Sequence, residues 1–228
     1  MNNPSAGPVI AIDGTSGSGK SSTSRGVAER LGLRYLDTGA MFRAMTWWML
    51  EHGVDVNDPR AVASYAGAPE IVSGTDPRRP AIVVGERDVA TAIRSDEVNA
   101  AVSPVSAVPE VRARLLDLQR AVIGDGGIVV EGRDIGSVVA PDAEVKIYLT
   151  ADPAARARRR ALEEGGADVS ATEESLLNRD RIDSGRATAP LVMAEGAAHI
   201  DSTDLTLDEV IDRVVALVEQ AGAVGDPA

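Results

Sequence analysis

Residues 9–31 read VIAIDGTSGSGKSSTSRGVAERL, and this stretch decides the fold of the chain. It opens with the short apolar run Val9–Asp13, which predicts a buried strand. Its last part, from about Ser21 to Leu31, predicts a helix that ends at Gly32. The segment between them, GTSGSGKS, fits the pattern G-x-x-x-x-G-K-[ST], whose expected context is a preceding strand and a following helix. The sequence therefore predicts a phosphate-binding loop, or P-loop, at residues 14–21.

The residues of this loop suit a nucleoside triphosphate. Glycines let backbone N–H groups converge on phosphate oxygens, and the positive end of the following helix adds to the field. We expect Lys20 to reach the β- and γ-phosphates and the Ser21 hydroxyl to ligate Mg²⁺. Asp37 and Glu131 are candidates for contacts with that ion through water. The residues expected to bind ATP are Gly14, Thr15, Ser16, Gly17, Ser18, Gly19, Lys20, Ser21 and Ser22.

Beyond the P-loop, apolar segments alternate with helical patterns along the chain. Further buried strands are expected at Ile128–Val130, Val145–Leu149 and Ala198–Asp201. Strands that alternate with helices in this way are typical of parallel β-α units. We therefore expect an α/β fold.

Two capping boxes predict where the last two helices begin. Ser170-x-x-Glu173 would start a helix that runs into residues 179–186, and Thr206-x-x-Glu209 would start the final helix. The segment Asp58–Arg94 differs, because proline and glycine punctuate two short β-like runs there. We expect this segment to be a small insert on the main domain, and its sequence indicates no role.

The composition limits the partners of the chain. With 228 residues it can bury a sizeable core, and its formal charge of −12 disfavours nucleic acid, which is bound by a basic stripe. Since it has no cysteine, a disulfide framework and a thiolate metal site are excluded. It shows neither a secretory pattern nor an apolar stretch of the ~20 residues that a membrane span needs. We expect a cytoplasmic monomer that binds neither nucleic acid nor membranes.

The arginines indicate which kind of P-loop protein this is. A GTPase is disfavoured, because the chain lacks both N-K-x-D and D-x-x-G. Lysine occurs only at Lys20 and Lys146, so arginine supplies nearly all of the 23 basic residues. Phosphoryl transfer needs cations around the moving group, and arginine binds phosphate through two parallel hydrogen bonds. The arginines that flank polar turns or helix ends are Arg43, Arg112, Arg133, Arg179 and Arg186.

Taken together, these motifs resemble the bacterial cytidylate kinase family from the P-loop to Val218. The segments that carry the resemblance are GTSGSGKSS, YLDTGAMFRA, IRSDEVNAAVSPVSAVPEVRARLLDLQR, EGRDIGSVVAPDAEVKIYL, NRDRIDSGRATAPL and IDSTDLTLDEVI. The resemblance implies a three-layer fold around a parallel five-stranded sheet. The parts that it implies are a core of residues 1–38, 111–154 and 186–228, a nucleoside-monophosphate-binding insert at 39–110, and a lid at 155–185.

The resemblance also implies an enzyme that transfers the γ-phosphoryl group of ATP to CMP or dCMP with Mg²⁺. The implied catalytic residues are Lys20, Arg133, Arg179 and Arg186. Arg158 would be the lid arginine that closes over the ATP phosphates. The residues implied to bind the acceptor are Thr38, Arg43, Ser103, Arg112, Arg133, Asp134, Arg179, Asp183 and Arg186.

Two residues depart from the family pattern. Thr38 stands where some members carry serine, which keeps the hydroxyl and adds a methyl group. Phe42 stands where many members carry tyrosine, so any hydrogen bond of the phenol is lost. Neither departure removes a charge from the implied site.

Asp134 would explain a preference for cytosine. A carboxylate accepts a hydrogen bond from the exocyclic amine of cytosine and repels the carbonyl that uracil has in its place. No general base is needed, because a phosphomonoester with a second pKa of ~6 is already largely ionised at neutral pH. Two alternatives stay open: a kinase of UMP, AMP or shikimate, and an ATP-dependent switch without an acceptor.

Overall fold

The computed structural model of the chain describes residues 7–163, 166, 168–185 and 189–222. The chain divides into two compact units, of which the first is Met1–Tyr35 with Asp125–Ala228 and the second is Leu36–Gly124. The second unit extends further than the insert expected at 39–110, because helix α5 (Pro109–Ile123) belongs to it.

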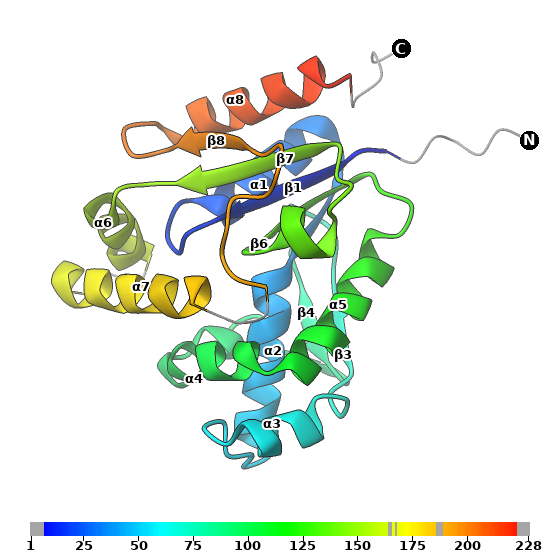
Figure 1. Ribbon diagram of the computed structural model, residues 1–228, viewed down its shortest axis with the longest axis vertical. Coiled ribbons are helices and arrows are strands. Elements are labelled where there is room, and N and C mark those ends of the chain that lie inside the picture. The colour runs from blue at the N-terminus through cyan, green and yellow to red at the C-terminus, as the bar shows by residue number, and fades with distance from the viewer. Residues whose placement is uncertain (1–6, 164–165, 167, 186–188, 223–228) are drawn as a thin grey trace, which may run out of the picture. The chain divides into compact units, whose positions relative to one another are not determined.

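A five-stranded sheet forms the centre of the first unit, in the order β2-β6-β1-β7-β8 (Figure 1). The strands are β2 (Arg34–Asp37), β6 (Ile128–Gly132), β1 (Val9–Gly14), β7 (Val145–Thr150) and β8 (Ala198–Asp201). β1 pairs in parallel with β6 and β7, and the register sets Asp13 beside Gly132 and Tyr148. The segments that follow these three strands therefore start at one edge of the sheet, where open α/β sheets bind ligands. The α/β fold with a parallel five-stranded sheet is confirmed.

Helices α1 (Lys20–Leu31) and α8 (Leu207–Gln220) pack on one face of this sheet. Ile10 and Ile12 of β1 are buried there in one apolar cluster with Val27 of α1 and Val214 of α8. Successive side chains of a strand point to opposite faces, so Asp13 shares the other face with Ala11. There it meets the short π-helix η2 (Ile135–Val139).

Helix α6 (Pro153–Glu163) follows β7 directly, and α7 (Val169–Ser184) packs against it. The predicted start of α7 at Ser170 is wrong. Asp168 is the N-cap, because its carboxylate accepts a hydrogen bond from the Ala171 N–H at 2.8 Å. The capping box of Thr206 and Glu209 is confirmed at the start of α8, with both of its hydrogen bonds present.

The second unit combines helices with a small antiparallel sheet. Its helices are α2 (Thr38–Glu51), α3 (Pro59–Tyr65), η1 (Ala92–Arg94), α4 (Asp96–Ala107) and α5. Its strands are β3 (Ile71–Ser73), β4 (Ile82–Val84) and β5 (Arg87–Asp88), paired in the order β3-β4-β5. Both β-like runs predicted within Asp58–Arg94 are confirmed as β3 and β4.

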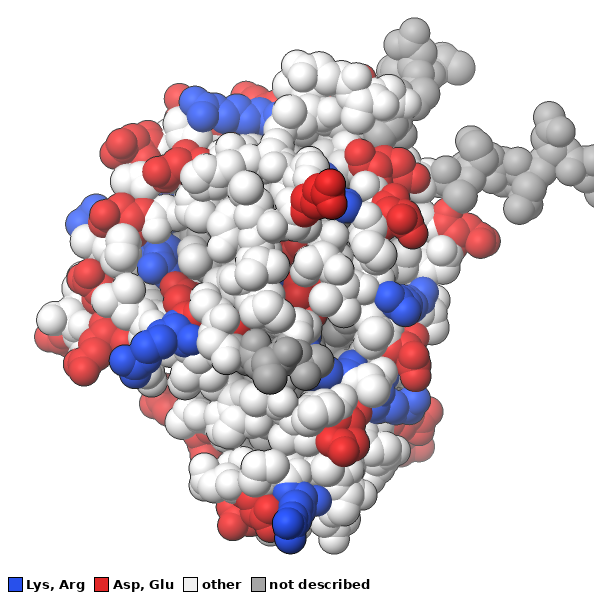
Figure 2. Space-filling model, in the orientation of Figure 1, with Lys and Arg blue, Asp and Glu red and all other residues white. Residues whose placement is uncertain are grey.

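The surface is rich in charge. Figure 2 shows acidic and basic side chains interspersed with one another on the face in view. Of the helices described, none combines the length and the apolar character that crossing a membrane requires.

Candidate active site

The P-loop joins β1 to α1, and two of its positions require glycine. A Cβ at Gly14 would lie 1.9 Å from the carbonyl oxygen of Leu149 on β7. Gly19 is the N-cap of α1 and has a φ of 88°, in the left-handed region that favours glycine. Because Gly19 has no side chain to cap the helix, the amides of the first turn are left to bind an anion. The strand, loop and helix predicted around residues 14–21 are confirmed.

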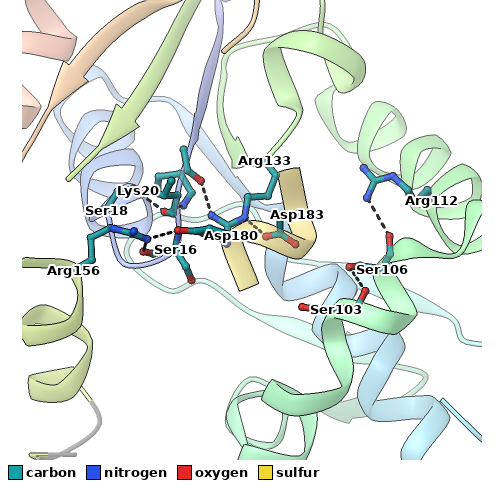
Figure 3. A network of polar contacts seen from close by, with 12 residues as sticks. Ser16, Ser18, Lys20, Ser103, Ser106, Arg112, Arg133, Arg156, Asp180 and Asp183 are labelled. Atoms are coloured by element: carbon teal, nitrogen blue, oxygen red, sulfur yellow. Dashed lines mark hydrogen bonds and ion pairs between the residues drawn. The ribbon is translucent and has the colours of Figure 1, made fainter. Parts of the chain in front are cut away.

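Three cationic side chains from separate segments each donate a hydrogen bond to a carbonyl of the P-loop (Figure 3). The pairs are Arg133 Nη1 to Gly14 O at 2.5 Å, Lys20 Nζ to Thr15 O at 2.7 Å, and Arg156 Nη1 to Ser16 O at 3.0 Å. The donors come from the turn after β6, from α1 and from α6. Three successive carbonyls are thus held by cations, and positive charge gathers beside the phosphate-binding loop.

Two carboxylates of α7 face these arginines. Asp183 is buried and accepts a hydrogen bond from Arg133 Nε at 2.8 Å. Asp180 pairs with Arg156 and lies 3.8 Å from Arg133 Nη2. Asp180 also accepts a hydrogen bond from the Ser16 N–H at 3.1 Å. Helix α7 is therefore tied both to the P-loop and to the turn after β6.

Burial disfavours the charged form of two of the cations. Burial, followed by the charge of Arg133, lowers the pKa of Lys20 to about 7, although the carboxylates of Glu131 and Asp180 act in the opposite direction. Burial also lowers the pKa of Arg133. The neighbouring carboxylates therefore do not offset the cost of burying the Lys20 ammonium. A polyanion such as a triphosphate would supply the missing negative charge.

The turn after β6 carries Arg133 and Asp134, and Asp13 of β1 holds the residues that follow it. Asp13 Oδ1 accepts a hydrogen bond from the Ile135 N–H at 2.7 Å, and its Oδ2 accepts one from the Gly136 N–H at 2.8 Å. Burial raises the pKa of Asp13 to about 6, with a further contribution from Asp134, although the two hydrogen bonds oppose it. Asp134 itself is only 5% exposed, so its carboxylate lies in a confined environment.

The second unit holds two of the arginines expected at the acceptor. Arg43 on α2 donates a hydrogen bond to the side chain of Asn99 on α4. Arg112 on α5 is buried, and its Nη1 donates to Ser106 O at 3.2 Å (Figure 3). Its guanidinium also lies 5.3 Å from the centre of the Phe42 ring. The ring that replaces the family tyrosine therefore makes a cation–π contact with a residue expected at the site.

Two small hydroxyl residues of this unit are buried as well. Thr38 is the first residue of α2, and Ser103 lies on α4, where its carbonyl accepts a hydrogen bond from Ser106 Oγ at 3.0 Å. Asp37 is the N-cap of α2 and accepts a hydrogen bond from the Ala40 N–H at 2.9 Å. The role of Asp37 that the structure describes is thus the capping of a helix.

The arginine of α6 that contacts the P-loop is Arg156, whereas the resemblance implied Arg158. Arg158 is exposed on α6, about 200° around the helix from Arg156. The position of Arg156 is a signal that the sequence does contain. Arg156 lies in the first turn of the helix that follows β7, and that turn starts at the same edge of the sheet as the P-loop. Arg179 is half-buried on α7, and Arg186 lies outside the described residues.

The residues expected to bind Mg²⁺ fit an ion held mainly by phosphate oxygens. Ser21 is exposed in the first turn of α1, whereas Glu131 is buried in β6 and accepts a hydrogen bond from the Tyr35 hydroxyl at 2.5 Å. In the described part of the chain, no three His, Cys, Asp or Glu side chains gather as a metal-binding group. Mg²⁺ in kinases commonly takes one or two protein ligands and otherwise phosphate oxygens and water, so a single hydroxyl and a carboxylate suit it.

Comparisons with known proteins agree with this geometry. The family model described as "Cytidylate kinase" matches residues 10–220. A cytidylate kinase of Streptomyces avermitilis is 58% identical over 217 residues, which cover 94% of each chain. A cytidylate kinase of Mycobacterium leprae is 48% identical over 95% of this chain and 98% of its own. The solved shikimate kinase of Acinetobacter baumannii in complex with shikimate has a TM-score of 0.50 at 14% identity, over 95% of each chain, and shares the fold. This chain belongs to the cytidylate kinase family.

Proposed function

We propose that this chain transfers the γ-phosphoryl group of ATP to CMP, and also to dCMP, and that the products are CDP or dCDP and ADP. The observation that carries the proposal is the set of three cations on successive P-loop carbonyls, next to a turn that bears the confined Asp134 carboxylate. Membership in the cytidylate kinase family supports it over a kinase of shikimate or AMP and over a switch without an acceptor.

On the donor side, we assign residues 14–22 to the ATP phosphates. Lys20 would leave Thr15 O, to which it now donates, and turn to the β- and γ-phosphates. The Ser21 hydroxyl would hold Mg²⁺, which when bound neutralises charge on those phosphates. Arg156 already lies against the loop, and we add it to the cations assigned to ATP, beside Arg158.

The chemical step is an in-line displacement at the γ-phosphorus. An oxygen of the CMP phosphate forms a bond to that phosphorus, while the bond to the oxygen bridging to the β-phosphate breaks and leaves its electron pair on ADP. Lys20, Arg133, Arg179 and Arg186 would stabilise the charge that spreads over the transferring group. The nucleophile is already ionised at neutral pH, so this chain needs no general base.

On the acceptor side, Asp134 would read the base. Its confined carboxylate would accept a hydrogen bond from the amine of cytosine and leave the carbonyl of uracil without a donor. Arg43 would hold the acceptor phosphate, and Arg112 would lie at the cytosine ring. Asp183 would accept hydrogen bonds from the ribose hydroxyls. Thr38 and Ser103, both buried hydroxyl residues, would face the base and the ribose.

We also propose the division of labour among the parts and the state of the protein. Residues 39–110 would form the acceptor-binding insert and residues 155–185 the lid that closes over ATP. The protein would act as a cytoplasmic monomer that binds neither nucleic acid nor membranes. Sedimentation velocity of the purified chain tests the monomer, because a dimer would double the measured mass.

An acceptor panel tests the activity. Purified protein is incubated with ATP, Mg²⁺ and either CMP, dCMP, UMP, AMP or shikimate, and ADP release is followed. We expect rapid release with CMP and dCMP and slow release with UMP. Turnover only with another acceptor, or ATP binding without acceptor-dependent turnover, would contradict the proposal.

A further inference from the structure

Asp180 of α7 makes contacts that its position in the sequence does not explain. Its Oδ1 accepts a hydrogen bond from the Ser16 N–H of the P-loop at 3.1 Å, and its Oδ2 pairs with Arg156 of α6. Arg133 Nη2, from the turn after β6, lies 3.8 Å from Oδ1. Figure 3 shows the carboxylate among these three groups, each of which comes from a different segment.

The same carboxylate compensates the cations around it. Asp180 raises the pKa of Lys20 and of Arg133, acting against the burial that lowers both. The side chain of Arg156 is only 5% exposed and that of Arg133 only 14%, so water screens their repulsion poorly. Without Asp180, the guanidinium groups of Arg133 and Arg156 would repel each other and the Lys20 ammonium beside the loop.

We propose that Asp180 is a positioning residue for phosphoryl transfer, which holds Arg156 and Arg133 in the orientation that the transferring group requires. This inference rests on the proposed function. A carboxylate is repelled by phosphate, so Asp180 acts through the two arginines and through the Ser16 amide. Arg156 donates to both Asp180 and Ser16 O, so the carboxylate fixes this guanidinium against the loop.

A role of Asp180 in stability alone and a role in positioning lead to different expected results for its removal. If Asp180 only stabilised the fold, its removal would lower the melting temperature and weaken every ligand alike. If it positions the arginines, its removal slows turnover, whereas ATP binds as well as before or more tightly, because a negative charge near the phosphates has gone. The split between kcat and ATP affinity therefore distinguishes the two roles.

The first test compares Asp180→Asn, which keeps the shape and removes the charge, with Glu219→Gln, an exposed position on α8 that lies outside the proposed site and lid. With CMP as acceptor, we expect kcat of Asp180→Asn to fall about tenfold to a hundredfold, with the Kd for ATP equal to or below that of the wild type. Glu219→Gln should match the wild type. An unchanged kcat, or an equal loss in kcat and ATP affinity, would overturn the inference.

A double-mutant cycle shows whether Asp180 acts through Arg156. In an Arg156→Ala background, Asp180→Asn should cost less than about threefold in kcat, because the group that it positions is already absent. If the loss of kcat in the double variant equals the product of the losses in the two single variants, Asp180 does not act through Arg156.

A final measurement needs no turnover and keeps the inference separate from the activity. In protein labelled with ¹⁵N-arginine, the Nη–H signals of Arg156, assigned with Arg156→Lys, should be protected from exchange in the wild type, because Nη1 donates to Asp180 and to Ser16 O. They should lose that protection in Asp180→Asn. Unchanged protection would overturn the inference, whereas a wild type inactive on CMP would contradict only the proposed function.

Discussion

Arg133 Nε donates a hydrogen bond to Asp183 Oδ2 at 2.8 Å, and this pair joins the turn after β6 to helix α7. Both side chains are shielded from water, with exposed fractions of 14% and 2%. When one partner of a buried pair is removed, the other charge is left without compensation. The stability of the first unit should therefore depend on this pair more than on ion pairs at the surface.

Asp183→Ala tests that dependence. We expect the free energy of unfolding to fall by about 2–3 kcal/mol, a value reduced because Arg133 keeps its bond to Gly14 O and its proximity to Asp180. The control is Asp212→Ala, which breaks the exposed pair with Arg30 and should cost at most about 1 kcal/mol. Urea denaturation of both variants gives the comparison, and equal losses would contradict it.

Lys20→Met should separate catalysis from stability. The lowered pKa of Lys20 shows that the fold disfavours its charge, so the variant should be at least as stable as the wild type. Its kcat should fall about a hundredfold or more, because the cation assigned to the β- and γ-phosphates is lost. Lys146→Met is the matched control, since that residue is the other lysine of the chain and contacts Glu195 O. Near-normal turnover of Lys20→Met would remove it from the site.

Asp134→Asn should change the choice of base. The amide can donate to the carbonyl of uracil and presents its own NH₂ group to the amine of cytosine. We expect the ratio of kcat/KM for CMP over UMP to fall about tenfold or more. Steady-state kinetics with both acceptors measure the ratio. If it stays constant, the base is read elsewhere.

Asp13 should make the protein less stable as the pH rises from about 4 to about 6. Its pKa is raised to about 6 in the folded state, so within this window the folded chain binds a proton that the unfolded chain has released. A pKa rise of this size corresponds to about 3 kcal/mol of folding stability. This stability is present below the pKa of the unfolded chain and is lost as the pH passes through the raised pKa.

The difference between wild type and Asp13→Asn isolates this contribution. Measured by urea denaturation between pH 4 and 7, the stability of the wild type relative to the variant should decrease with rising pH. Asp201→Asn should show the opposite slope, confined to the acid range below about pH 4, because hydrogen bonds from Thr203 lower the pKa of Asp201. A flat difference for Asp13→Asn would show that its carboxyl titrates normally.

Local patterns in the sequence predicted the elements of the fold well. The apolar runs predicted four strands of the five-stranded sheet and missed β2. Gly14 follows from its close contact with Leu149 on the neighbouring strand, whereas Gly19 follows from its left-handed φ. Local patterns failed where two candidate caps lay close together. Asp168 and Ser170 can each cap a helix, and the sequence does not say which amide the carboxylate will reach.

The polar network was harder to predict, because its partners are distant in sequence. Asp180 and Ser16 lie 164 residues apart, and Arg156 and Ser16 lie 140 apart. Helical spacing decides that Arg156 faces the P-loop and that Arg158 is exposed, but only once the direction of α6 relative to β7 is known. The family resemblance predicted Arg133 and Asp183 as site residues. Asp13 and Asp180, whose carboxylates hold other groups in place, belong to no motif that would have predicted this role.

The three cations on the carbonyls of residues 14–16 have a mechanical consequence. A peptide plane carries its oxygen and its hydrogen on opposite sides, so an anchored oxygen also sets the direction of the next amide. Rotation of any of these planes would break a charge-assisted bond to a different part of the chain. When Lys20 turns from Thr15 O to the phosphates, Arg133 and Arg156 would still hold the carbonyls of Gly14 and Ser16. The backbone of the loop should therefore change little when nucleotide binds, and the entropy lost on binding should come from side chains, Lys20 among them, and from the nucleotide itself.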